Sequence, residues 1–155
     1  MPVALSYIVS FINVGIYWGN HHHLIHTIKD VRGNILWANL HLLFWLSLMP
    51  FATAWMGENH FEPNTLATYA ILADLCGVAY SILLWNIKKC NPGNTALLAV
   101  LKRQTKKGII SCVLYTLAIP MAYVSEYVAG ALIIAVAISW LIPDRNIEKV
   151  ESFRS

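Results

Sequence analysis

Charged side chains are scarce in this chain of 155 residues, where Asp, Glu, Lys and Arg together make up only 12%. A soluble globular domain usually carries about a quarter charged residues. Hydrophobic residues account for 57% of the chain, and the mean hydropathy is +0.56. This composition excludes an ordinary water-soluble domain and predicts a protein whose solvent is lipid.

Catalytic and metal-binding patterns are also missing. The three cysteines show neither CxxC spacing nor a Cys/His pattern of the kind that zinc needs, so we expect reduced, structural thiols. No GxSxG, phosphate-binding loop, HExxH or useful pair of carboxylates occurs. The chain opens on Met1 and Pro2 without a basic segment, so we expect no cleavable signal peptide. We predict no enzymatic activity, no cofactor and no metal centre.

Long apolar runs are what the chain has in abundance. They cover about residues 3–19, 35–56, 66–87, 108–124 and 127–142. Each run is long enough, or nearly so, to cross a bilayer as a helix. No segment alternates strictly enough to be a strand of an outer-membrane barrel. The sequence therefore predicts an all-α integral membrane bundle over residues 1–142, followed by a polar cytoplasmic tail over 143–155.

The basic residues are segregated along the chain. All eleven Lys and Arg residues fall between the first and second runs, between the third and fourth, or after the fifth. The other connections carry only Glu58, Glu62 and Glu126. Because cytoplasmic segments collect Lys and Arg, we predict a multi-pass protein of the cell membrane with its C-terminus in the cytoplasm. The basic residues flank apolar runs and form no single face, so we expect no nucleic-acid partner.

One connection has internal structure of its own. Residues 91–94 read as a turn, and residues 95–104 then set leucines against Lys102 and Arg103. This pattern predicts a short separate amphipathic helix that lies on the inner membrane surface.

The densest polar cluster follows the first apolar run. It contains Asn20, His21, His22, His23 and His26. Neutral imidazoles suit Zn²⁺, Ni²⁺ or Cu²⁺, and His22 and His26 would share a face if the helix continued. The alternative is that these side chains bond to helix ends and neighbouring helices. With no cysteine nearby and no carboxylate closer than Asp30, we favour the structural role.

A few polar residues interrupt the later runs. Asn39 and His41 are two positions apart and cannot share a helix face, so at most one points at a given neighbour. Asp74 is the single acid within a run. An intramembrane carboxylate indicates cation binding, proton transfer or a hydrogen bond to a neighbouring helix. We regard Asp74 and Thr53 as candidate residues of a polar or ion path, with simple interhelical bonding as the alternative.

Two stretches carry a resemblance to a known family. Residues 12–23 (INVGIYWGNHHH) and 35–53 (ILWANLHLLFWLSLMPFAT) resemble the transmembrane-protein-175 family of potassium-permeable channels, and the similarity covers about residues 7–142. The resemblance implies a six-helix repeat, cytoplasmic termini and a homotetramer around a central pore. In that family the first helix lines the pore and carries an Arg and a Phe-Ser-Asp signature. The five runs match helices two to six, so we expect a truncated, mis-started or divergent member without the pore helix.

The resemblance also implies roles for individual residues. Asn20, His21 and His22 match the end of the family's second helix, where a polar network faces the pore helix. Asn39 and Thr53 match the family's third helix. The resemblance thus implies that Asn20, His21, His22 and Asn39 form a structural polar network beside the position of the missing helix.

The sequence predicts a subunit of a potassium-permeable channel. Because the pore helix is expected to be missing, the prediction includes a subunit that does not conduct on its own. The resemblance implies that selectivity arises from a hydrophobic constriction, and the lack of a TVGYG-like filter sequence in the chain agrees with this. The expected partners are the lipid bilayer, potassium ions and further copies of the chain in a homotetramer. One alternative is a non-conducting membrane interaction or accessory protein. Another is a metal or proton transporter that uses the histidine cluster and Asp74.

Overall fold

The computed structural model describes residues 2–26, 28 and 32–141 and shows them as a bundle of helices without strands. The helices are α1 (Pro2–His26), α2 (Gly33–Glu58), α3 (Pro63–Cys90), α4 (Thr95–Val124) and α5 (Glu126–Leu141). The predicted all-α membrane bundle is confirmed. The polar tail predicted over 143–155 lies outside the described residues.

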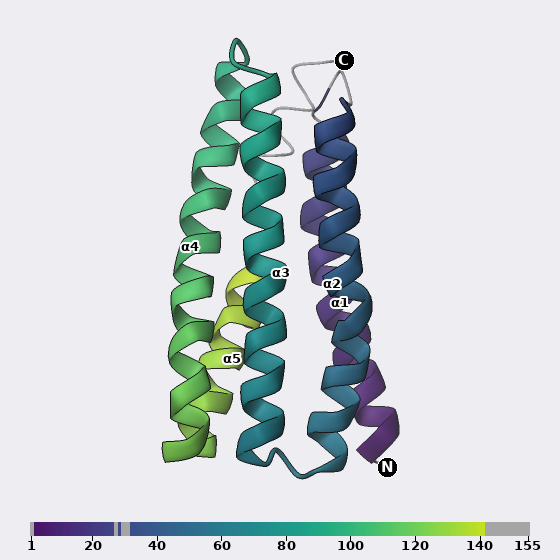
Figure 1. The fold of residues 1–155 in the computed structure, drawn as a ribbon, viewed down its shortest axis with the longest axis vertical. Helices are drawn as coiled ribbons and strands as arrows, with labels where there is room; N and C mark the ends of the chain where they lie inside the picture. Colours follow the sequence, from purple (N-terminus) through teal and green to yellow (C-terminus); the bar gives the residue numbers. More distant parts are fainter. Residues whose placement is uncertain (1, 27, 29–31, 142–155) are drawn as a thin grey trace.

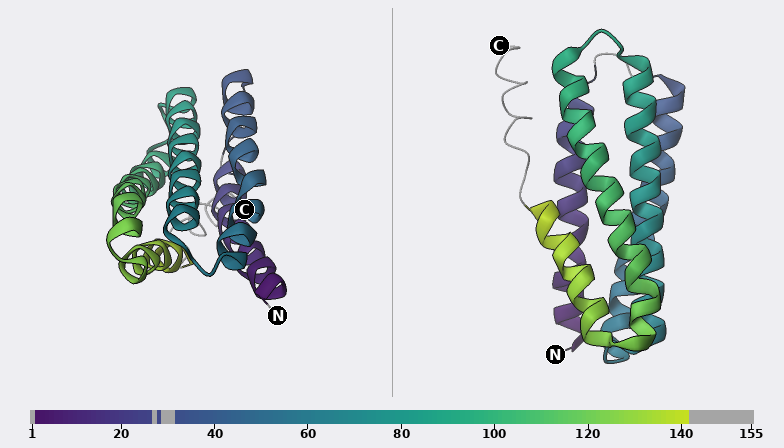
Figure 2. Two further views of the ribbon diagram at one scale, coloured as in Figure 1. Left: turned by 60° about the horizontal axis from the view of Figure 1, so that its bottom comes forward. Right: turned by 90° about the vertical axis from the view of Figure 1, so that its left-hand side faces the viewer.

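The helices run up and down next to one another, with α3 in the middle (Figure 1). α3 packs against α2, α4 and α5, whereas α1 packs against α2 and more lightly against α5. α5 turns back from the lower end of α4 and is the shortest helix, with 16 residues (Figure 2). The central place of α3 explains why its side chains dominate the buried core.

Small side chains allow α3 to pack on several neighbours at once. Its buried positions include Ala67, Ala70, Ala73, Cys76, Gly77 and Ala79. In a membrane, small residues at helix interfaces let the backbones approach closely, which is the main source of packing energy there. The contact is tightest at Gly77, where a Cβ atom would lie 2.8 Å from the Sγ of Cys112 on α4.

Most of the helices are long enough to span the hydrocarbon core of a bilayer. Three stretches of the described chain are long and apolar enough to cross a bilayer, namely Gly33–Glu58, Pro63–Cys90 and Leu97–Val124. Glu126–Leu141 is a shorter apolar helix. Each of the first four predicted runs lies inside one helix. α5 begins and ends one residue before the fifth predicted run.

The prediction of a separate amphipathic helix is wrong, because residues 95–104 continue without a break into the 30 residues of α4. Leu97 and Leu101 are buried in the same core cluster as Leu84 of α3. Their apolar stripe is therefore covered by protein and not by the membrane surface. α4 is about 45 Å long and exceeds the hydrocarbon thickness of about 30 Å, so its first turns extend beyond the apolar core of a bilayer.

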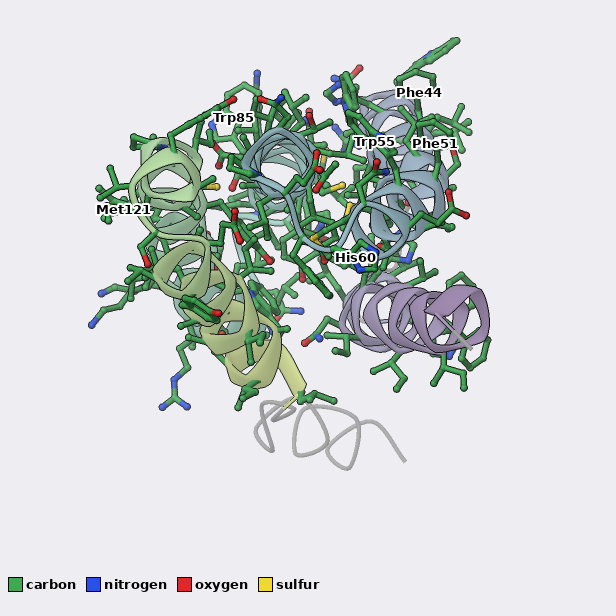
Figure 3. The ribbon with its side chains drawn as sticks, turned by 90° about the horizontal axis from the view of Figure 1, so that it is seen from below. Phe44, Phe51, Trp55, His60, Trp85 and Met121 are labelled. Atoms are coloured by element: carbon green, nitrogen blue, oxygen red, sulfur yellow. The ribbon has the colours of Figure 1, made fainter. Side chains whose placement is uncertain are left out.

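The outer face of α2 is strongly apolar. Trp37, Phe44 and Phe51 recur at seven-residue steps and are 72%, 56% and 73% exposed. Figure 3 shows Phe44 and Phe51 on the side of α2 that points away from the other helices. Such a face would be unfavourable in water and is typical of a helix that contacts lipid or another membrane helix.

Candidate functional site

The polar residues at the end of α1 join this helix to its neighbours. His21 is only 6% exposed, and its Nε2 donates a hydrogen bond to the Oδ1 of Asn39 on α2. An amide oxygen only accepts, so this bond requires the tautomer of His21 that carries its proton on Nε2. The bond connects two helices at a half-buried position, where a polar group without a partner would be costly.

Asn20 and His22 lie on either side of this pair. The Nδ2 of Asn20 donates to the carbonyl oxygen of Ile16 at 2.9 Å and to that of Trp140 on α5 at 3.4 Å. His22 is exposed and stacks on Trp18, with 5.6 Å between ring centroids and an interplanar angle of 26°. The structure thus brings Asn20, His21 and Asn39 into contacts between helices and leaves His22 on the outer face of α1.

Trp140 is a contact residue that no sequence pattern marks as functional. Its Nε1 donates to the Oγ of Ser111 on α4 at 2.8 Å, and its ring meets Tyr80 of α3 edge to face at 5.7 Å. The Nζ of Lys107 lies 4.7 Å from the ring centroid. Through these contacts and Asn20, the end of α5 is attached to α1, α3 and α4. A Trp near the end of an apolar run is expected at the membrane interface. The sequence gives no signal that distinguishes such an interfacial Trp from one that packs between helices.

Asp74 belongs to a second polar cluster, between α3 and α4. Its Oδ2 accepts a hydrogen bond from the Oγ1 of Thr116 at 3.0 Å, whereas its buried Oδ1 has no partner in the described part of the chain. A cavity of about 380 Å³ borders this carboxylate and is also lined by Ser81, Cys112 and Thr116. The other residues that line the cavity are apolar, so these polar groups border a mainly apolar cavity.

Thr53 lies apart from this cluster. It is 2% exposed, and its hydroxyl donates to the carbonyl oxygen of Met49 on the same helix at 2.8 Å. The structure therefore pairs Asp74 with Thr116 and leaves the Thr53 hydroxyl bonded within α2.

The described side chains give no geometry for a metal site. No three of the described His, Cys, Asp or Glu residues lie close enough together to hold an ion. α1 does continue through His26, as the metal hypothesis required, but the side chains of His23 and His26 lie outside the described ones. The geometry that is present consists of hydrogen bonds between helices.

Comparisons with known proteins agree with this membrane bundle. The family model of the endosomal/lysosomal potassium channel TMEM175 matches residues 1–50. A protein of Chryseobacterium sp. (strain P1-3) named as a potassium channel is 50% identical over 149 residues, which make up 96% of this chain and 77% of that protein.

A second protein named as a potassium channel, from Streptomyces collinus, is 27% identical over 92 residues, which make up 57% of this chain and 45% of that protein. No solved structure matches the chain. The similarity to the Chryseobacterium protein extends over nearly the whole chain, and the family model covers the residues that bear the histidine cluster. The resemblance noted in the sequence is confirmed, and the chain belongs to the TMEM175 family.

Proposed function

We propose that this protein is a channel subunit that passes potassium ions across the cell membrane and has no enzymatic activity. The observation that carries the proposal is the 50% identity to a protein named as a potassium channel over 96% of the chain. The long apolar helices supply the membrane-spanning scaffold that such a subunit needs. The family resemblance implies that a hydrophobic constriction discriminates among ions, and the lack of a carbonyl filter sequence in the chain agrees with this.

The proposed orientation places the basic end of the bundle in the cytoplasm. The last turn of α1, the first turn of α2 and the connection from α3 to α4 lie at the upper end of the bundle, and the connections from α2 to α3 and from α4 to α5 lie at the lower end (Figure 1). The upper end carries Arg32, Lys88 and Lys89, and the lower end carries Glu58, Glu62 and Glu126. Positive charge is retained in the cytoplasm, which supports a cytoplasmic C-terminus.

The proposed assembly is a homotetramer in which α1 contacts the pore-lining helix that the family resemblance implies. A Cβ atom at Gly15 or Gly19 would meet open space, so this small-xxx-small pair is available to another helix. Phe11 and Trp18 on the same side of α1 are 69% and 58% exposed. The bonds of Asn20 and His21 to Trp140 and Asn39 would hold this face in place.

Potassium flux through liposomes tests the proposal. The purified chain and the Chryseobacterium relative are reconstituted in parallel, and flux is followed with a potassium-sensitive dye after a potassium gradient is imposed. We expect flux from both proteins, above that of empty liposomes. If the relative conducts and this chain does not, the channel proposal fails for the chain alone. Co-purification of the chain with the relative would then support a non-conducting accessory subunit.

The replacement of Asp74 by asparagine tests whether this carboxylate belongs to the ion path. Asparagine keeps an oxygen that accepts the bond from Thr116, and its amide places a donor where the carboxylate has an unpaired oxygen. We therefore expect an unchanged melting temperature and potassium flux within about twofold of the wild type, because a neutral amide suits a membrane interior better than a carboxylate.

A loss of flux without a loss of stability in the Asp74→Asn protein would show that permeating ions need the charge. Thr116→Val is the matched variant, because it removes the hydroxyl that contacts Asp74 and leaves the carboxylate in place. If Thr116→Val keeps full flux while Asp74→Asn does not, the carboxylate and not the α3–α4 contact is required.

A further inference from the structure

A large crevice opens between α3 and α4 at the basic end of the bundle. Its volume is about 1130 Å³, and its lining comes from the last three turns of α3 and the first four turns of α4. The crevice is distinct from the polar cluster at the end of α1. Figure 3 places Trp85, one of its lining residues, beside the gap between α3 and α4.

The outer end of this crevice is cationic. Lys88 of α3 and Lys102, Arg103 and Lys106 of α4 line it, and none of its described lining residues is acidic. The neighbouring Lys89 and Lys107 do not line the crevice. Their ammonium groups lie instead over the rings of Trp85 and Trp140, at 5.2 and 4.7 Å from the ring centroids. The four lining cations therefore form a concentrated positive patch that suits an anionic group.

The floor of the crevice, and the part of its walls farther from the end of the bundle, are apolar. Leu84 and Leu101, each 2% exposed, form its floor. Trp85, Ile109 and Ile110 form its walls and are 61%, 56% and 50% exposed. From Lys102 to Ile110 the helix rises about 12 Å, which is close to the hydrocarbon depth of one leaflet, about 15 Å. The crevice is thus amphipathic along its length, with its charge where lipid headgroups lie.

We propose that this crevice binds an anionic phospholipid of the cytoplasmic leaflet. The phosphate would contact Lys88, Lys102 and Lys106, and one acyl chain would lie along the isoleucines and Trp85. A free phosphate ion would satisfy the cationic end alone and leave the apolar walls uncovered. Basic pockets between transmembrane helices on the cytoplasmic side are a recurrent setting for anionic headgroups. The proposal concerns lipid binding and does not depend on whether the chain conducts potassium.

Thermal unfolding of the intact chain in a neutral detergent tests this proposal. Phosphatidylglycerol, phosphatidylcholine or inorganic phosphate is added, and the melting temperature is read from tryptophan fluorescence. We expect phosphatidylglycerol to raise the melting temperature by several degrees, because a ligand that binds only the folded state stabilises it. Phosphatidylcholine and inorganic phosphate should have little effect. Equal stabilisation by inorganic phosphate, or none by phosphatidylglycerol, would overturn the proposal.

Charge variants distinguish a specific lipid-binding site from general electrostatic attraction between anionic lipid and the basic end of the bundle. Lys102→Gln with Lys106→Gln should weaken phosphatidylglycerol binding roughly tenfold or more, since each basic residue near the headgroups contributes appreciably. The matched control is Lys29→Gln with Arg32→Gln, which removes the same charge from the segment between α1 and α2 and leaves Lys89 in place over Trp85. An equal loss in both double variants would show non-specific attraction and refute the site.

A third variant fills the crevice and keeps its charge. Ala99 is exposed and lines the crevice, so Ala99→Trp should block the lipid without removing a cation. We expect this variant to keep the helix content and the lipid-free melting temperature of the wild type while it loses the response to phosphatidylglycerol. Retention of the full response would contradict a lipid held between α3 and α4.

Discussion

Gly77→Val is expected to destabilise the bundle strongly, because it overfills the contact between α3 and α4. A Cβ atom at this position would lie 2.8 Å from the Sγ of Cys112, and valine adds two further methyl groups at a buried point of contact. Overpacking of this kind costs about 1–3 kcal/mol. In a membrane protein the loss weakens the main stabilising interaction between α3 and α4, which is close packing. Tryptophan fluorescence during thermal unfolding would show the change as a fall of several degrees.

Alanine variants provide a matched control for this prediction. Gly108 also lies in the α3–α4 contact, but its Cβ would sit 3.7 Å from the Oγ of Ser81, an ordinary contact distance. Gly108→Ala should therefore be neutral or stabilising, by up to about 1 kcal/mol from helix propensity. Gly77→Ala should be less stable than Gly108→Ala, and Cys112→Ala should restore part of the difference. If both alanine variants are equally stable, the close contact at Gly77 does not limit packing.

Breaking the bond between His21 and Asn39 is expected to give the second large effect. Either His21→Ala or Asn39→Ala leaves the remaining polar group without its partner between α1 and α2. An unpaired buried polar group costs about 1–3 kcal/mol. The double variant should lose less stability than the two single losses combined, because both partners are then removed. We expect a coupling energy of about 0.5–2 kcal/mol from unfolding of the four proteins in detergent.

His22→Ala is the control for this cycle. His22 adjoins His21 but is exposed and stacks on Trp18, so its replacement should cost less stability than the replacement of buried His21. A larger loss at His22 than at His21 would contradict the assignment of the interhelical bond. Strictly additive effects of His21→Ala and Asn39→Ala would show that the bond contributes nothing to the α1–α2 contact.

Some of the site could be derived from the sequence alone. The separation of Asn39 from His41 followed from helix geometry. In the structure Asn39 faces His21, whereas the Nε2 of His41 accepts a bond from Trp45 at 2.9 Å. Asp74 stood out because a carboxylate is rare inside a membrane helix. Its partner Thr116 is 42 residues away, and nothing in the local sequence marks that hydroxyl as the one that reaches the carboxylate.

The sequence by itself determined the class of fold and the family of this protein. Hydropathy, the segregation of Lys and Arg and the stretch through the histidine cluster are all read along the chain, so no knowledge of packing is needed. Only the tertiary structure decided which faces meet, that residues 95–104 belong to α4, and that Trp140 joins four helices. The physical reason is that these helices are apolar on most sides, because lipid and protein neighbours accept the same side chains. Small residues such as Gly77 and scattered polar groups select the contacts, and their partners lie far away in sequence.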